Sequence, residues 1–171
     1  MKLFLPLFSL PCLTAAAQDP CGADKLTLNL SSIELSSYYT YVSPSAAGPK
    51  LGIISFDLSN SQVNYTTHCR TAQSVSPFGN FYGFMWWNCT APGAVWPDAE
   101  TRFSFETAGS VVVLNTTWSC GGDVVYTTSA PGRVDNWGCM SWTWQNPDWQ
   151  PGEIWSNTTT WCGVGEVVLV R

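Results

Sequence analysis

The sequence has little positive charge and almost no histidine. Seven lysine and arginine residues stand against twelve aspartate and glutamate residues, which gives a formal net charge of −5 at pH 7. Proteins that bind nucleic acids or anionic lipids need clustered cations, so we expect neither nucleic acid nor membrane as a partner. His68, the only histidine, is the single candidate for the base of a hydrolytic mechanism. It alternates with polar residues such as Arg70, which indicates a solvated surface residue instead.

After residue 17 the sequence has no apolar run long enough to span a membrane. The last apolar run, at residues 167–170, has only four residues. By contrast, the N-terminus combines Lys2, an apolar stretch at residues 3–13 and three consecutive alanines, which is the pattern of a secretory signal peptide. We therefore expect a signal peptide at residues 1–17 and a single secreted, extracellular domain at residues 18–171.

Motifs of common secreted enzymes and metal proteins are also absent. The sequence has no G-x-S-x-G turn, no histidine near residue 18 of the kind that a copper-dependent polysaccharide oxygenase needs, and no metal-ligand spacing. A glycosidase needs two carboxylates beside its sugar, and Glu100, Glu106 and Glu153 are candidates. Because any secreted β protein offers two carboxylates, this signal is unspecific. We expect no enzymatic activity, no cofactor and no metal ion.

Cysteine is present in a number that suits disulfide bonding. One of the seven cysteines, Cys12, falls in the expected signal peptide and leaves six in the secreted chain. An even number in an oxidising compartment predicts three disulfides. The sequence alone allows about 15 pairings of six cysteines, so it leaves the connectivity open.

The chain shows many short strand patterns and no sustained helical period. Turn residues separate these runs, as in the loop expected at residues 43–49. Many short strands at this spacing predict an all-β domain, either an antiparallel β-barrel or a β-sandwich, stabilised by disulfides. The expected strands are residues 26–31, 38–42, 51–58, 63–70, 81–89, 101–106, 111–120, 124–129, 140–144, 154–162 and 166–170.

Five N-glycosylation sequons report on which strand faces point to solvent, because a glycan must point outward. Asn29, Asn64 and Asn115 alternate with apolar residues, so each shares a polar face. Asn88 and Asn157 instead stand an even number of positions from aromatic residues and so lie on the same strand face as these. If both asparagines are glycosylated, aromatic rings must also lie on outer faces. The expected glycosylation sites are Asn29, Asn64, Asn88, Asn115 and Asn157.

Residues 137–162 hold six of the ten tryptophans and have the pattern of a β-hairpin. Large apolar residues alternate with Ser141 and Thr143 at residues 140–144. The alternation stops at the turn sequences QNPD (residues 145–148) and PG (residues 151–152) and resumes from residue 153. The rings either fill the core, pack under a glycan or form an exposed binding patch. Alternation of side chains along the strand expected at residues 154–162 predicts that Ile154 and Cys162 point inward. It places Trp155 and Trp161 on the same outer face as Asn157. The candidate binding residues are Trp142, Trp144, Trp149, Trp155 and Trp161.

Four short stretches form a recognisable pattern: LGIISFDL at residues 51–58, YTTHC at residues 65–69, FYG at residues 81–83 and WNC at residues 87–89. This pattern resembles the fungal secreted family typified by the major Alternaria allergen. The resemblance covers roughly residues 21–120 and weakens afterwards. It implies a compact β-barrel without known enzymatic activity, found in allergens and in effectors that meet plant defence proteins. It also implies the disulfides Cys69–Cys89 and Cys139–Cys162, with Cys21–Cys120 as the remaining pair.

The resulting leading hypothesis is a secreted, glycosylated, non-enzymatic binding protein, an allergen-like fungal effector that engages a host extracellular defence protein. The alternative is a carbohydrate-binding module that uses the tryptophan-rich hairpin to bind a cell-wall glycan. The third and weakest hypothesis is a small glycosidase with Glu153 at its centre.

Overall fold

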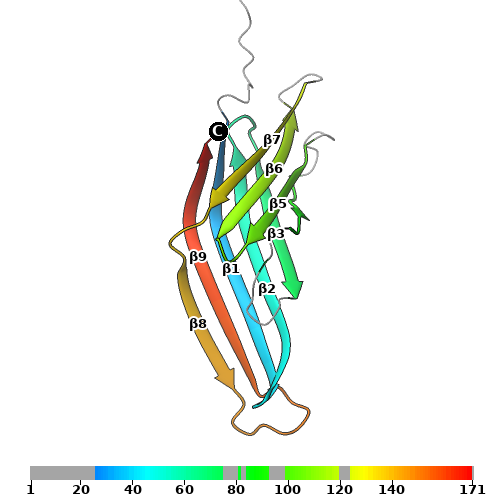
Figure 1. The fold of residues 1–171 in the computed structure, drawn as a ribbon, viewed down its shortest axis with the longest axis vertical. Coiled ribbons are helices and arrows are strands. Elements are labelled where there is room, and N and C mark those ends of the chain that lie inside the picture. Colours follow the sequence, from blue (N-terminus) through cyan, green and yellow to red (C-terminus); the bar gives the residue numbers. More distant parts are fainter. Residues whose placement is uncertain (1–25, 75–80, 82–83, 93–98, 120–123, 171) are drawn as a thin grey trace, which may run out of the picture.

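The fold is an antiparallel β-sandwich, seen in a computed structural model that describes residues 26–74, 81, 84–92, 99–119 and 124–170. Two sheets pack face to face and do not close into a barrel (Figure 1). This confirms the all-β prediction and decides between its two architectures. The described residues contain no helix long and apolar enough to cross a membrane.

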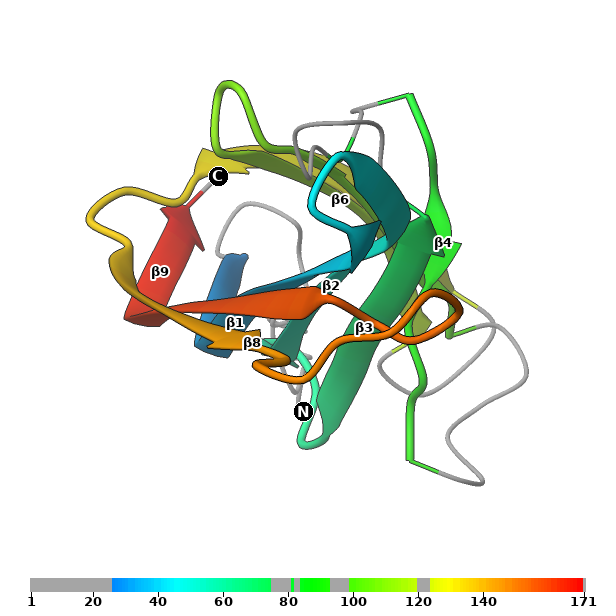
Figure 2. The same cartoon turned by 90° about the horizontal axis from the view of Figure 1, so that it is seen from below.

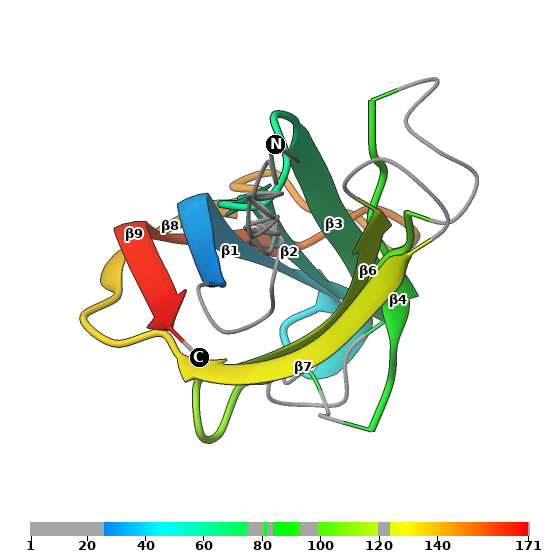
Figure 3. The ribbon, with the colours of Figure 1, turned by 90° about the horizontal axis from the view of Figure 1, so that it is seen from above.

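Sheet A has the strand order β3-β2-β1-β9-β8 and sheet B the order β4-β5-β6-β7, with antiparallel pairing throughout. Viewed along the long axis, the two sheets form two curved layers (Figures 2 and 3). The strands are β1 (Thr27–Ser43), β2 (Ala46–Asn60), β3 (Thr66–Ser74), β4 (Trp87–Asn88), β5 (Thr101–Glu106), β6 (Val111–Ser119), β7 (Val125–Arg133), β8 (Gly138–Gln145) and β9 (Ser156–Val170).

Sheet A has longer strands than the sequence pattern indicates. The expected strands at residues 26–31 and 38–42 are two parts of β1, which pairs along its length with both β2 and β9. The register shifts at Ser32, which has a positive φ of 53°. In the expected loop at residues 43–49, Ser43 already pairs with Ala46. Pairing on both sides of β1 satisfies its backbone and overrides the polar composition of the intervening residues.

The core lies between the two sheets and is rich in aromatic rings. Phe56 of sheet A meets Phe103 of sheet B edge-to-face, with ring centroids 5.0 Å apart. Trp118 is fully buried and stacks on Tyr126 at 5.7 Å. Burying each such side chain stabilises the fold by roughly 1.5–3 kcal/mol. The fully buried large side chains are Trp118, Phe56, Phe81, Phe103, Phe105, Leu26, Leu28, Leu30, Ile33, Ile54, Leu114 and Val112.

One side of the sandwich is fastened by a disulfide between the sheets. Cys69 of β3 bonds to Cys89, the residue after β4. Beside it, the backbones of His68 and Thr90 exchange two hydrogen bonds of 2.9 and 2.7 Å. Because both links join sheet A to the β4 side of sheet B, they fix the relative position of the two layers there. This is one of the pairs that the family resemblance implies.

The opposite side is closed by packing of β7 against β9. Gly132 of β7 faces Leu169 of β9 so closely that a Cβ atom at Gly132 would lie 2.1 Å from Leu169 Cδ2. Leu169 is buried. A side chain at Gly132 would therefore force Leu169 to move or the two strands to separate.

Sheet A extends well beyond sheet B. The lower parts of β1, β2 and β9 and all of β8 lie past the end of sheet B in Figure 1. The inner face of this extension is polar: Ser141 bonds to Thr160 at 2.8 Å, and Thr143 to Thr158 at 2.9 Å. Burial raises the pKa of Tyr39 on the same face, and nearby Tyr41 adds to the effect. The inner face of the extension is therefore partly buried at Tyr39, whereas Ser141 and Thr143 on the edge strand β8 are exposed.

Candidate binding face

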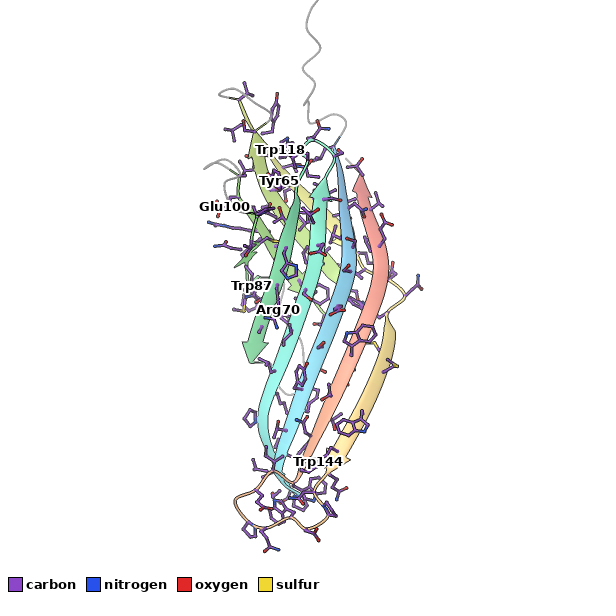
Figure 4. All side chains as sticks on the ribbon, turned by 180° about the vertical axis from the view of Figure 1, so that it is seen from behind. Tyr65, Arg70, Trp87, Glu100, Trp118 and Trp144 are labelled. Atoms are coloured by element: carbon purple, nitrogen blue, oxygen red, sulfur yellow. A yellow bond between two sulfur atoms is a disulfide. The ribbon has the colours of Figure 1, made fainter. Side chains whose placement is uncertain are left out.

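The outer face of sheet A, which points away from sheet B, carries three exposed tryptophans. Trp142 and Trp144 lie on the edge strand β8, and Trp161 lies on its neighbour β9. Their exposed fractions are 65%, 42% and 40%. Met140, the cross-strand partner of Trp161, is 69% exposed. We call these four side chains the indole face; it occupies the extension of sheet A, where Trp144 lies near the tip (Figure 4).

The strand register continues the indole face across sheet A. Trp142 pairs with Thr159, Thr159 with Tyr38, and Tyr38 with Leu51, so these residues form one row over four strands. Tyr38 and Leu51 are exposed as well. Since strands lie about 4.8 Å apart, the row makes a broad apolar strip with a threonine inside it. An apolar surface of this kind is typical of an interaction site.

The other three tryptophans of residues 137–162 have structural roles. Trp149 is half-buried, and its Nε1–H donates to the carbonyl of Glu153 at 3.0 Å inside the β8–β9 loop. Trp155 packs edge-on against Tyr41 at 6.4 Å. Trp137 packs against the core ring of Phe105 at 6.3 Å. The candidate binding set therefore narrows from five tryptophans to Trp142, Trp144 and Trp161.

The predicted alternation of inward and outward side chains is confirmed within β9 but is wrong for Ile154, which precedes this strand. Cys162 is buried, and Trp161 shares the outer face with Asn157. Ile154 was expected to point inward but is 46% exposed. The reason is that β9 begins at Ser156, so the alternation of a strand does not extend back to residue 154.

A shallow groove of about 360 Å³ borders the indole face at Trp161. Gly163 forms its floor, and the benzene half of the Trp161 indole lies over this glycine, with Cη2 2.9 Å from where a Cβ would be. Gly138 and Glu34 flank Gly163 on the two neighbouring strands. The sequence pattern did not identify this groove, although Gly163 and Gly165 interrupting a strand were an available signal.

The candidate glycosidase carboxylates do not form a catalytic pair. Glu100, the residue before β5, pairs with Arg102, and Glu106 ends β5, so residues 100 and 106 lie roughly 20 Å apart along the extended chain. Glu153 accepts hydrogen bonds from Asn146 and from the backbone of Gln150 in the β8–β9 loop. Retaining and inverting glycosidases need carboxyl groups about 5–10 Å apart, which residues 100 and 106 do not provide. The β8–β9 loop that holds Glu153 lies at the far end of the sheet A extension from β5 (Figure 1), so Glu153 is not brought beside either of them.

His68 is held by a neighbouring carboxylate on the outer face. Its Nδ1 lies 2.8 Å from Asp57 Oδ1, and both side chains are about half exposed. Its placement agrees with the surface position expected from the sequence. Among the described residues, no group of three His, Cys, Asp or Glu side chains is arranged to hold a metal ion.

The sequon asparagines differ in accessibility. Asn64, Asn88 and Asn115 are exposed. Asn29 is half-buried, and its Nδ2 donates to Glu166. Asn157 is half-buried between Trp144 and Thr40, with its Oδ1 buried and without a partner among the described residues. A glycan on Asn157 would therefore emerge beside the indole face.

The second implied disulfide, Cys139–Cys162, joins β8 to β9 at the upper end of this hairpin. It pins the edge strand that carries Trp142 and Trp144 to the centre of sheet A. The third expected pair, Cys21–Cys120, and the expected signal peptide lie outside the described residues.

Comparison with known protein families identifies the group to which these strands and disulfides belong. The family model of Alternaria alternata allergen 1 matches residues 35–162. The chain belongs to this family. The match to the allergen 1 family begins within β1 and ends at Cys162, so it includes most of the tryptophan-rich hairpin. The resemblance recognised in the sequence, by contrast, weakens after residue 120. No curated protein and no solved structure matched the chain.

Proposed function

We propose that this member of the allergen 1 family is a secreted, glycosylated, non-enzymatic effector that binds a host extracellular defence protein through the indole face. The observation that carries the proposal is the exposure of Trp142, Trp144 and Trp161 on one face of sheet A. Tryptophan and tyrosine are enriched among the residues that dominate protein–protein binding energies. Family membership supports the allergen-like, non-enzymatic assignment.

Hydrogen bonds and a disulfide hold the edge strand that presents this face. Trp142 and Trp144 alternate with Ser141 and Thr143, whose hydroxyl pairs with β9 fix the edge strand from the other side. The disulfide Cys139–Cys162 fixes its upper end. Rings held in place before binding lose less conformational entropy when the complex forms.

The test compares purified wild-type protein with a Trp142→Ser/Trp144→Ser double variant. Wild-type protein should bind purified plant extracellular defence proteins and alter a plant defence response, and the double variant should bind at least tenfold more weakly, as expected for loss of residues worth 1–2 kcal/mol each. Val125→Ser, which removes an exposed apolar residue from β7 in sheet B, is the matched control. Absence of any binding or response with wild-type protein would refute the effector role.

A carbohydrate-binding module is the second candidate function. The observation in its favour is that hydroxyl and amide side chains, Thr159 and Asn157, lie directly across from Trp142 and Trp144. Sugar recognition combines an aromatic surface with such polar groups. Retention of the wild-type protein on a cell-wall polysaccharide, lost in the same double variant, would establish this function; no retention on any glycan of an array would eliminate it.

A further inference from the structure

The groove beside Trp161 has an unbalanced charge. It is lined by Ser32, Ile33, Glu34, Gly138, Trp161, Gly163, Val164 and Gly165. Among these residues Glu34 is the one acid, and no base is present. The ion pairs His68–Asp57, Arg102–Glu100 and Arg133–Asp135 do not involve Glu34, which has no counter-ion among the described residues. The groove thus offers a carboxylate whose charge is not compensated locally.

The same geometry places the indole next to this carboxylate. Glu34 and Gly163 are direct cross-strand partners, and side chains at such positions start about 5 Å apart. Trp161 fills the space above Gly163 because the glycine has no side chain of its own. The exposed indole and the Glu34 side chain therefore border one small hollow on the outer face.

A carboxylate next to an indole matches the chemistry of a cationic side chain. Tryptophan is the best aromatic partner for a cation, and an arginine or lysine head group carries only hydrogen-bond donors. The lining side chains supply few donors themselves, namely the Ser32 hydroxyl and the indole N–H, whereas a neutral sugar needs donors and acceptors in similar numbers. We propose that this groove binds the arginine or lysine side chain of a basic protein partner.

Charge complementarity supports a basic partner. The chain has a net charge of −5, which attracts a basic protein over longer distances and raises the association rate. On the outer face the nearest base in the same row is Arg70, separated from Glu34 by Ser55 of β2, at about 10 Å between strands. This inference rests on the proposed function, since it names the chemistry of the protein partner that the outer face engages.

The test uses short peptides on the folded, disulfide-bonded protein. A blocked peptide with one arginine between glycines is titrated while NMR follows the indole N–H signals, of which Trp161 is assigned by its loss in Trp161→Phe. We expect a saturable shift of the Trp161 signal, an affinity about two- to fivefold weaker in Glu34→Gln, and no saturable shift with the uncharged citrulline peptide. Glu100→Gln, which removes an exposed carboxylate on the β5 side (Figure 4), should bind as wild type.

Equal binding of the citrulline peptide, unchanged affinity in Glu34→Gln, or a saturable shift of Trp161 with a neutral oligosaccharide instead would overturn the proposal. The result is separable from the proposed function. If the wild-type protein and Glu34→Gln bind a plant defence protein equally, the indole face remains the binding site while the cation groove is refuted. If no defence protein binds but the arginine peptide does, the proposed function fails and the groove stands.

Discussion

Replacing Gly132 by alanine should weaken the contact that closes the sandwich between β7 and β9. The added Cβ would lie 2.1 Å from Leu169 Cδ2 and 3.2 Å from its Cγ and Cδ1. Leu169 is buried, so its side chain must rotate or the two strands must separate. Forcing extra volume into a packed site costs about 1–3 kcal/mol, and for a protein of this size each kcal/mol lowers the melting temperature by about 2–4 °C.

The control is Gly165→Ala on β9, where an added Cβ meets nothing within 4 Å. This change should leave the free energy of unfolding unchanged or raise it by up to about 1 kcal/mol, because alanine restricts the unfolded chain. Urea unfolding of both variants measures the difference. Equal stabilities of Gly132→Ala and Gly165→Ala would refute the close approach of the strands.

A double-mutant cycle locates the clash. Leu169→Ala alone should destabilise the protein because it removes buried apolar volume. In the Gly132→Ala/Leu169→Ala variant the new methyl group occupies part of that space, so the combined cost should be smaller than the sum by about 0.5–3 kcal/mol. Strict additivity would show that the two residues do not touch.

Three further predictions concern the indole face, the disulfides and the sequons. Gly163→Ala should displace the Trp161 indole, seen as increased acrylamide quenching and as loss of arginine-peptide binding. Gly138→Ala, whose Cβ meets its nearest atom at an ordinary 3.7 Å, should leave the quenching of wild type unchanged. Replacing both cysteines of either disulfide by serine should lower the free energy of unfolding by about 3 kcal/mol, since sequence separations of 20 and 23 close loops of similar length. The loss should be larger for Cys69–Cys89, because Cys69 is fully buried and this bond joins the two sheets. A larger loss for Cys139–Cys162 in urea unfolding would contradict this ranking. In protein secreted by a eukaryotic host, glycopeptide mass spectrometry should find sugar at the exposed Asn64, Asn88 and Asn115 and less at Asn29, whose amide is held by Glu166; full occupancy at Asn29 would contradict it.

Strand faces were predictable from the sequence wherever a strand has one buried side. Leu28 and Leu30 are buried and Asn29 lies on the opposite face, as their alternation indicates. The same rule correctly placed Cys162 and Trp161. It works because a side-chain period of two is fixed by the backbone itself and does not depend on the partner strand.

Strand length and the roles of individual tryptophans were not predictable in this way. The polar residues in the middle of β1 pair with β2 and β9, and nothing in their own composition indicates that two neighbours will cover them. Trp149 and Trp161 are the same residue type in one segment, yet the first bonds to a loop carbonyl and the second lies over Gly163. Only the tertiary arrangement separates these environments. The groove at Glu34 likewise combines residues more than 100 positions apart in the chain.

Because sheet A extends beyond sheet B, we expect two zones of different hydrogen-exchange protection. Leu28 and Leu30 are buried in the core between the sheets, so exchange of the amides near them should require separation of the layers. Amides near Tyr39 and Thr158 belong to the single-layered part, where strand opening exposes little additional apolar area on the inner side and therefore needs less free energy. Because the indole face lies on this less protected zone, binding of a partner there should slow exchange most at the uncovered end and leave the double-layered end unchanged.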